Sequence, residues 1–258
     1  MSYIDSTSSP LQGRHLLVLG AAGEIGESLV AEAIARGATV TAMSRSDTRL
    51  DSLRERLALD TRLTPRIAMA FRPFVGELNT EADSDTLRQA MLNSGEPIDG
   101  VIASLGGWRQ GTPVIATALG SWHETLAQSL TAHFLAARAL LPLLAARAGS
   151  SYSFINGGAA ISPVPGAGPM CVSAAAQLML MRVLADELAH DVVRINALVL
   201  ATPVLSRSRP SGPVTWLTAP GVGQYAARLA SDEGVSLRGQ IITLRDARDL
   251  EQLPRRER

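Results

Sequence analysis

Residues 15–26 read HLLVLGAAGEIG, an apolar run followed by Gly20, Gly23 and Gly26 at a spacing of three residues. The apolar run is typical of a buried strand, and the residues after Gly23 are compatible with a helix. Glycines in such a turn let the backbone approach a pyrophosphate, and the N–H groups at the start of the helix favour an anion. Alternatively, the glycines could form a tight turn that binds no ligand. Because it lies between a predicted strand and a predicted helix, we expect a dinucleotide site.

Short apolar runs alternate with longer helical patterns along the rest of the chain. The predicted strands are 15–19, 39–43, 66–71, 98–103, 152–155, 193–199 and 240–244. The predicted helices are 25–36, 48–59, 83–92, 121–147, 169–190 and 222–230, and 201–220 is predicted to be a loop. This alternation predicts the α/β class, a Rossmann-like doubly wound parallel sheet of about seven strands with helices on both faces. We expect a single domain over 14–245, with an N-terminal tail (1–13) and a charged C-terminal tail (246–258).

The composition limits the class of protein. The chain has 258 residues, enough for one domain with a full core, and 46% of them are hydrophobic. Its 24 acidic residues balance its 24 basic ones, so we expect no nucleic-acid partner and no binding to an anionic membrane surface. No set of His, Cys and carboxylate residues has the spacing of metal ligands, so we expect no metal.

Three features suggest a location. The single cysteine, Cys171, excludes an internal disulfide and fits a reducing compartment. Residues 1–13 lack the basic start and apolar stretch of a signal peptide. The long apolar helices are interrupted by Arg, His or Pro, so we expect no membrane-spanning segment. The expectation is a soluble cytoplasmic protein.

The second predicted strand ends at Ser44-Arg45, where the adenosine ribose of a dinucleotide would lie. An acidic residue there would hydrogen-bond the ribose hydroxyls of NAD, whereas an arginine can pair with the 2′-phosphate of NADP. Arg45, helped by Ser44 and Arg49, therefore favours NADP(H). The alternative is that Arg45 is an ordinary solvated arginine.

These features together resemble the short-chain dehydrogenase/reductase family over about 15–244. Further landmarks are Asp99 before the fourth strand, Arg-Ile-Asn-Ala at 194–197 and Arg-Gly-Gln at 238–240. The glycine spacing resembles that of the extended or atypical branches, whereas the chain length is that of the short, single-domain branch. In the family, the helices that correspond to 121–147 and 169–190 pack across a two-fold axis. The resemblance therefore implies a homodimer or homotetramer, although these helices could simply cover the sheet.

The resemblance also implies a set of binding residues. Glu77-Leu78 resembles the family's contact to adenine, with Glu in place of Asp. The implied cofactor-binding residues are Gly20, Ala22, Gly23, Glu24, Ile25, Gly26, Ser44, Arg45, Glu77, Leu78, Ser104, Leu105 and Gly106. Trp108 and Arg109 would line the substrate entrance. Arg109 would either clamp an anionic substrate or simply be solvated.

The sequence departs from the family at the catalytic positions. Ser129, Gly157, Met170 and Ala174 stand where the family has Asn, Ser, Tyr and Lys, and the chain contains no lysine at all. In the family, the lysine cation makes the tyrosine phenolate accessible by lowering a pKa that is ordinarily about 10. Methionine offers no proton, and arginine does not titrate usefully. The standard Tyr-Lys chemistry is therefore absent.

Several polar residues are weak candidates to replace it. Ser129 and His133 are one helical turn apart and could relay a proton, although such a pair is more often packing or subunit interface. Asn156 and Ser173 could hydrogen-bond a ligand. Cys171 is next to Met170, but a lone cysteine with apolar neighbours is usually a small core residue.

Three functions remain open. The first is an atypical oxidoreductase that binds NADP(H) and a carbonyl or hydroxyl substrate, in which positioning supplies much of the rate. The second is a pseudoenzyme that binds a cofactor or a partner. The third is a redox-neutral cyclase or isomerase that reuses the same cleft.

Overall fold

A seven-stranded parallel sheet forms the centre of the computed structural model, which describes residues 9–254. The strand order is β3-β2-β1-β4-β5-β6-β9. The strands are β1 (His15–Leu19), β2 (Thr39–Ser44), β3 (Phe71–Val75), β4 (Gly100–Ala103), β5 (Ser151–Gly157), β6 (Arg194–Leu200) and β9 (Ile241–Leu244). The predicted doubly wound α/β fold is confirmed. Residues 1–8 of the predicted N-terminal tail and 255–258 of the C-terminal tail lie outside the described residues.

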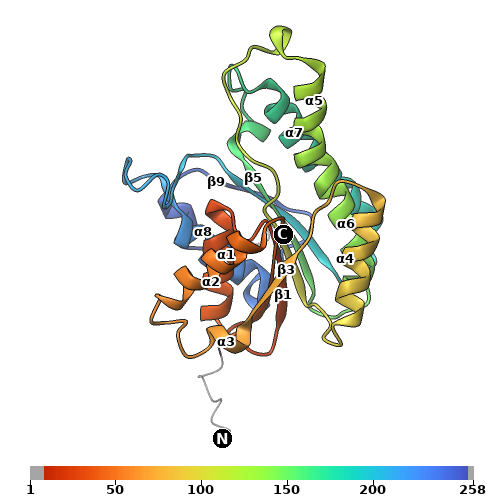
Figure 1. The fold of residues 1–258 in the computed structure, drawn as a ribbon, viewed down its shortest axis with the longest axis vertical. Coiled ribbons are helices and arrows are strands. Elements are labelled where there is room, and N and C mark those ends of the chain that lie inside the picture. Colours follow the sequence, from red (N-terminus) through yellow and green to blue (C-terminus); the bar gives the residue numbers. More distant parts are fainter. Residues whose placement is uncertain (1–8, 255–258) are drawn as a thin grey trace, which may run out of the picture.

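Helices cover both faces of the sheet (Figure 1). The helices on one face are α1 (Glu24–Ala35), α2 (Asp47–Ala58) and α8 (Ala219–Ala230), and those on the other are α4 (Glu81–Asn93), α6 (Ala132–Leu144) and α7 (Gly168–Glu187). Strand β1 shows how the sequence produces two cores, because successive side chains of a strand point to opposite faces. Leu16 and Val18 pack with α1 and α8, whereas Leu17 and Leu19 pack with α4 and α6.

The prediction of a third strand over 66–71 is wrong. Residues Ile67–Ala70 form the short helix α3, and the strand begins only at Phe71. Ala and Met are good helix formers, and the backbone already turns before them, since the N–H of Ile67 donates to the carbonyl of Leu63 at 2.9 Å. Pro73 lies within β3 and lacks an N–H, which is tolerated because β3 is at the edge of the sheet.

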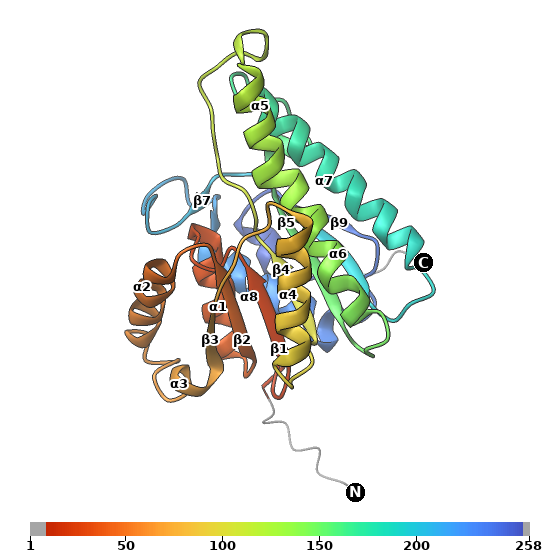
Figure 2. The same cartoon turned by 45° about the vertical axis from the view of Figure 1, so that its right-hand side comes forward.

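The predicted helix over 121–147 is divided in three. Helix α5 (Leu119–Leu126) continues through a π-helical turn, η2 (Ala127–Thr131), into α6. Figure 2 shows α5 projecting beyond the sheet beside the first half of α7. We call this projection the arm; it comprises residues 104–118 (with the short helix η1, Val114–Ala116), α5 and the start of α7.

The predicted loop 201–220 contains two short paired strands, β7 (Val204–Leu205) and β8 (Leu217–Thr218). The remaining short helices are η3 (Gly158–Ala160), η4 (Asp232–Gly234) and η5 (Ala247–Leu250). Helix η5 falls in the segment expected to be a charged tail, and Leu250 packs against the core with Leu253. By length and composition alone, helix α7 is apolar enough to cross a membrane. Core helices of soluble proteins also meet these two criteria.

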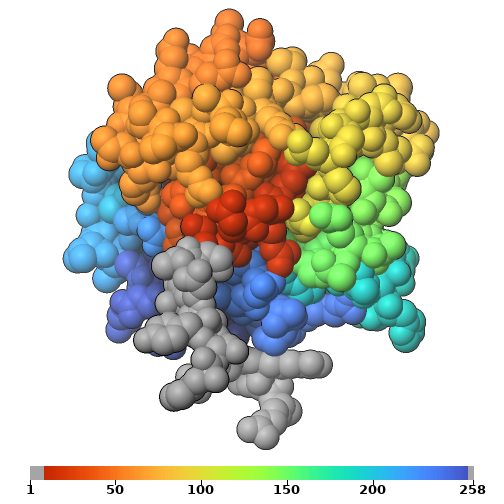
Figure 3. Space-filling view, turned by 90° about the horizontal axis from the view of Figure 1, so that it is seen from below, coloured from red at the N-terminus to blue at the C-terminus, as the bar shows by residue number. Residues whose placement is uncertain are grey.

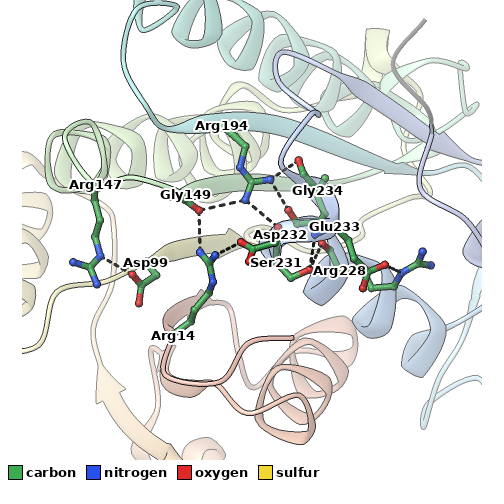
Figure 4. Close-up of polar contacts among 11 residues, drawn as sticks. Arg14, Asp99, Arg147, Gly149, Arg194, Arg228, Ser231, Asp232, Glu233 and Gly234 are labelled. Atoms are coloured by element: carbon green, nitrogen blue, oxygen red, sulfur yellow. Dashed lines mark hydrogen bonds and ion pairs between the residues drawn. The ribbon is translucent and has the colours of Figure 1, made fainter. Parts of the chain in front are cut away.

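Buried arginine holds the amino ends of the strands together, at the end of the sheet opposite the glycine turn (Figure 4). Arg194, at the start of β6, donates to the carbonyls of Gly234 (2.5 Å) and Gly149 (3.3 Å). Arg14, just before β1, donates to the same Gly149 carbonyl at 3.0 Å and pairs with Asp232. Burial lowers the pKa of Arg194 to about 10. Figure 3 views the molecule from this side, and the red N-terminal segment lies at the centre of the face.

Candidate functional site

The turn after β1 is built so closely that only glycine fits at two positions. Gly20 has a φ of 75°, and a Cβ there would overlap the backbone carbonyl of Ser104. A Cβ on Gly26 would overlap the backbone carbonyl oxygens of Gly20 and Ala21. Gly23 precedes α1 and provides no side-chain cap for its first turn. The first turn of the helix therefore has backbone N–H groups that are available to bind an anion.

A cavity of about 320 Å³, which we call the loop cavity, lies against this turn. It is formed at the carboxyl ends of β1, β2, β3 and β4, where ligands bind in open parallel sheets. Its lining residues are Gly20, Ala22, Gly23, Met43, Ser44, Arg45, Arg49, Gly76, Glu77, Leu78, Asn79, Ser104, Leu105, Gly106, Gly107, Trp108, Arg109, Gln128 and Ala132. The structure thus brings together most of the residues predicted to bind a cofactor.

Two arginines lie at the end of the loop cavity that faces β2. Arg45 is exposed, and Arg49 donates from Nη2 to the carbonyl of Ala22 in the glycine turn at 2.8 Å. Across the cavity, Nδ2 of Asn79 donates to the Glu77 carboxylate at 2.7 Å. This end therefore offers positive charge for an anionic group of a ligand.

Three of the predicted cofactor residues do not line the loop cavity. Ile25 lines a second cavity, at the carboxyl ends of β5 and β6. Gly26 contributes by allowing the turn to pack closely, since a Cβ there would overlap the backbone of the turn. The carboxylate of Glu24 is turned toward the segment after β7, where it accepts from the N–H of Ser208 at 3.2 Å and lies 3.6 Å from Arg207. The net effect of these surroundings is to lower the pKa of Glu24. Partial desolvation acts in the opposite direction, but the hydrogen bonds from the serines and the charge of Arg207 outweigh it.

A second cavity of about 230 Å³, the strand-end cavity, lies beside the carboxyl ends of β5 and β6. Its lining residues are Ile25, Ser104, Leu105, Gly106, Gly107, Trp108, Ser129, Ile155, Asn156, Gly157, Ala159, Met170, Ala174, Gln177 and Leu200. Ser129, Gly157, Met170 and Ala174, the four positions singled out in the sequence, therefore meet around one space. None of these described lining residues has a side chain that titrates.

Most replacement candidates are already engaged in packing. Asn156 donates from Nδ2 to the Ala174 carbonyl at 2.9 Å, and its Oδ1 accepts from the N–H of Gly157 at 2.8 Å. Ser173 is fully buried, with Gln177 as its hydrogen-bond donor at 3.5 Å. The Cys171 thiol accepts weakly from a backbone N–H in the preceding loop. Of these three residues, Asn156 lines the strand-end cavity.

His133 does not form a relay with Ser129. It is fully buried, its ring stacks on Phe154 with centroids 5.1 Å apart, and neither ring nitrogen has a hydrogen-bond partner. Burial lowers the pKa of His133 to about 4. The imidazole is therefore neutral and serves as an aromatic core side chain at neutral pH.

A third cavity of about 320 Å³, the arm cavity, opens between the loop of the arm, α5 and the start of α7. Its lining residues are Arg109, Gln110, Thr112, Ala116, Thr117, Ala118, Ser121, Thr125, Gly166, Pro169 and Met170. Arg109 is held by the Glu124 carboxylate through two 2.8 Å contacts and by Gln128 at 2.9 Å. Its positive charge is therefore already paired within the chain.

Sequence reasoning missed four polar or flexible contributors. Asn79 and Gly107 directly follow predicted residues and could have been included on that basis. Gln177 is three residues after Ala174 on the same helix face, and this spacing could have been used to predict that it lines the site. Gln128 precedes Ser129, but its place on the loop cavity depends on the π-helical turn, which nothing in the sequence indicates. Among residues 9–254, no group of three His, Cys, Asp or Glu side chains could hold a metal ion.

Comparison with known sequences gives one match over nearly the whole chain. A family model described as enoyl-(acyl carrier protein) reductase matches residues 20–245. Over 77 residues, the chain is 40% identical to dehydrogenase/reductase SDR family member 4 of Bos taurus and 39% identical to that of Homo sapiens. Each match covers 30% of this chain and 28% of the length of the curated relative.

Solved structures share the fold over most of their length. A short-chain type dehydrogenase/reductase from Mycobacterium ulcerans superimposes with a TM-score of 0.82 at 21% identity, over 93% of this chain and 90% of that one. A short-chain dehydrogenase from Shigella flexneri 2a, solved in complex with NADP, gives 0.80 at 22% identity, over 92% and 99%. At these identities the likeness establishes the architecture.

Proposed function

Because the chain belongs to the short-chain dehydrogenase/reductase family, we propose that it is an oxidoreductase that binds NADP(H) in the loop cavity and acts on a carbonyl or hydroxyl compound. The observation that carries this proposal is the glycine turn. Gly20 and Gly26 keep side chains out of the space beside the uncapped start of α1. This is the arrangement that a dinucleotide pyrophosphate requires.

The lining of the loop cavity fits the rest of the dinucleotide. Arg45 and Arg49 would hold the 2′-phosphate, an assignment supported by the NADP in the similar Shigella flexneri structure. Glu77 would lie at the adenosine end. When bound, NADP(H) supplies redox chemistry, while the chain binds and orients the ligands.

We infer that this protein is an atypical member that lacks a proton donor of its own. The side chains around the strand-end cavity offer hydroxyl, amide and apolar groups but none that titrates. A positioned acid or base is ordinarily worth about 10²–10⁴ in rate. The chain would then contribute to the rate by positioning the substrate through Ser129 and Asn156. Water would donate or accept the proton of the substrate.

The same observation favours a second candidate function, a module that binds a cofactor without turning over a substrate. Both functions require the loop cavity to bind a dinucleotide. They differ in whether a substrate is converted beside it, which a turnover assay against a panel of carbonyl compounds distinguishes.

Exposed apolar side chains on the helices behind the site support assembly into a homodimer or homotetramer. Phe134 of α6 is 48% exposed and Met179 of α7 is 55% exposed. Figure 2 shows α6 and α7 running side by side on one flank of the molecule. Light scattering after size exclusion should give a multiple of 27.2 kDa, and Met179→Arg should shift it toward the monomer.

Titration with NADPH and NADH, followed by cofactor fluorescence, tests the proposed cofactor. We expect micromolar binding of NADPH and weaker binding of NADH. Arg45→Ala should weaken NADPH binding by about tenfold or more, the value of one charge-assisted contact, and leave NADH binding unchanged. Arg88→Ala, an exposed arginine on α4, is the matched control and should change neither. Failure to bind either cofactor would contradict both candidate functions.

A further inference from the structure

The arm cavity and the strand-end cavity share one lining residue, Met170. Methionine is unbranched and flexible, so a side chain at this position can adjust to a ligand that passes it. The two cavities have volumes of about 320 and 230 Å³, comparable to or slightly below those that small ligands occupy.

The arm cavity offers neutral hydrogen-bonding groups beside apolar ones. The hydroxyls of Thr117 and Thr125 donate to backbone carbonyls of the arm at 3.1 and 2.8 Å, which leaves their oxygen lone pairs available as acceptors. Pro169 and Met170 supply apolar surface on the side of α7. Such a lining suits a molecule that is largely apolar with a few polar groups.

The lining of the two cavities is nearly neutral. Among the described residues that line the two cavities, Arg109 is the only one with an ionisable side chain. Its guanidinium faces Glu124 in a two-point ion pair, with a further hydrogen bond to Gln128. Both partners of this pair come from the arm, so the positive charge of Arg109 is balanced by Glu124 within the arm.

We propose that the strand-end cavity and the arm cavity are two ends of one binding site for an elongated, uncharged substrate. Its carbonyl or hydroxyl end occupies the strand-end cavity, and its apolar remainder passes Met170 into the arm cavity. Figure 2 shows α5 and α7 side by side, with the loop of the arm running alongside α5. This inference rests on the proposed function, because it names the substrate class of the same oxidoreductase site.

Calorimetric titration of the protein saturated with NADP⁺ tests this site with two matched probes. The neutral probe is 4-phenylcyclohexanone, and the charged one is 4-(4-oxocyclohexyl)benzoate. We expect the neutral ketone to bind at least about tenfold more tightly, since the carboxylate would be partly desolvated beside a lining whose one cation is already paired. Equal affinity of the two probes, or no binding of the ketone at millimolar concentration, would overturn the inference.

Two filling variants test whether one ligand spans both spaces. Ala116→Phe narrows the arm cavity and Ala159→Phe narrows the strand-end cavity. Each should weaken binding of the ketone about tenfold, whereas Ala82→Phe, an exposed position on α4, should not. An effect from only one filling variant would place the ligand in a single cavity and refute the spanning site.

Glu124→Gln tests the charge argument directly. Removal of the carboxylate frees Arg109, so the affinity for the benzoate probe should rise at least about fivefold while that for the ketone stays unchanged. No gain for the benzoate would overturn the assignment of Arg109 and Glu124. NADPH binding measured on the same samples separates failure of this inference from failure of the proposed function. If the wild-type protein does not bind NADPH, the proposed function is contradicted, whatever the affinities for the two probes.

Discussion

The carboxylate of Asp99 lies 2.6 Å from Nε of Arg147, at the end of the sheet opposite the candidate site (Figure 4). The same carboxylate accepts the backbone N–H of His15 at 2.8 Å. One buried side chain just before β4 thus joins the first residue of β1 to the loop that follows α6. This contact holds the amino ends of the strands in place without taking part in the site.

Asp99→Asn should lower the free energy of unfolding by about 1–2 kcal/mol, because it keeps an acceptor for His15 but removes the ion pair with Arg147. Urea unfolding followed by circular dichroism measures this loss. The control is Asp85→Asn, which breaks an exposed pair with Arg138 at 3.2 Å. It should cost less than about 0.5 kcal/mol. Equal losses in the two variants would show that burial of Asp99 adds nothing.

Stability should depend on pH through His133. Its pKa is about 4 in the folded chain and about 6.5 in the unfolded one. The unfolded state therefore binds a proton first as the pH falls. The stabilisation is fully present above pH 6.5 and decreases toward pH 4, by about 3 kcal/mol over that range. Unfolding by urea at a series of pH values measures this slope.

His133→Phe keeps an aromatic ring against Phe154 and removes the titrating group. The loss of stability between pH 6.5 and 4 should be smaller in this variant. Burial also lowers the pKa of His15, which remains in both proteins and cancels in the comparison. Parallel pH curves for wild type and variant would refute the role of His133.

Gly26→Ala should both destabilise the fold and impair dinucleotide binding. Its Cβ would overlap the carbonyl oxygens of Gly20 and Ala21, and overpacking of this kind costs about 1–3 kcal/mol. Thermal unfolding and NADPH titration measure the two effects. Gly120→Ala, on α5 and outside the lining of the loop cavity, is the matched control, since a Cβ there has no neighbour within 4 Å. An unchanged melting temperature for Gly26→Ala would contradict the geometry of the turn.

Glu24 holds the segment after β7 against the start of α1, through Ser208 and Arg207. Glu24→Ala should free this segment and speed tryptic cleavage after Arg207 about threefold or more, because cleavage requires local opening. Arg209 is followed by Pro210, which leaves Arg207 as the informative site. Mass spectrometry of early digests identifies the cut. Glu55→Ala, an exposed control on α2, should leave the rate unchanged.

The local sequence predicted the fold where the pattern and the packing agree. The apolar run of β1 and its three glycines identified both the central strand and the loop cavity. The pattern misled over 66–71, because apolar residues there suit a strand and a short helix equally well. The strand that follows contains Pro73, which only the strand order shows to be acceptable at an edge.

The candidate site was predictable as a set of motifs but not as a set of contacts. Ser129, Gly157, Met170 and Ala174 do meet around one cavity. The pairing of Arg109 with Glu124, 15 positions away in the sequence, was not visible because it depends on the path of the arm. The neutral state of His133 depends on burial between α6 and β5, which its spacing from Ser129 does not reveal.

Trp108 and Arg109 are adjacent in the chain, and between them they form part of the wall of all three cavities. A ligand that shifts this dipeptide in one cavity changes the shape of the other two. Thermodynamic linkage then makes the effect reciprocal: whatever factor a bound dinucleotide applies to the affinity for a second ligand, that ligand applies to the dinucleotide. Trp108 and Arg109 are therefore the residues through which ligands in different cavities would affect one another.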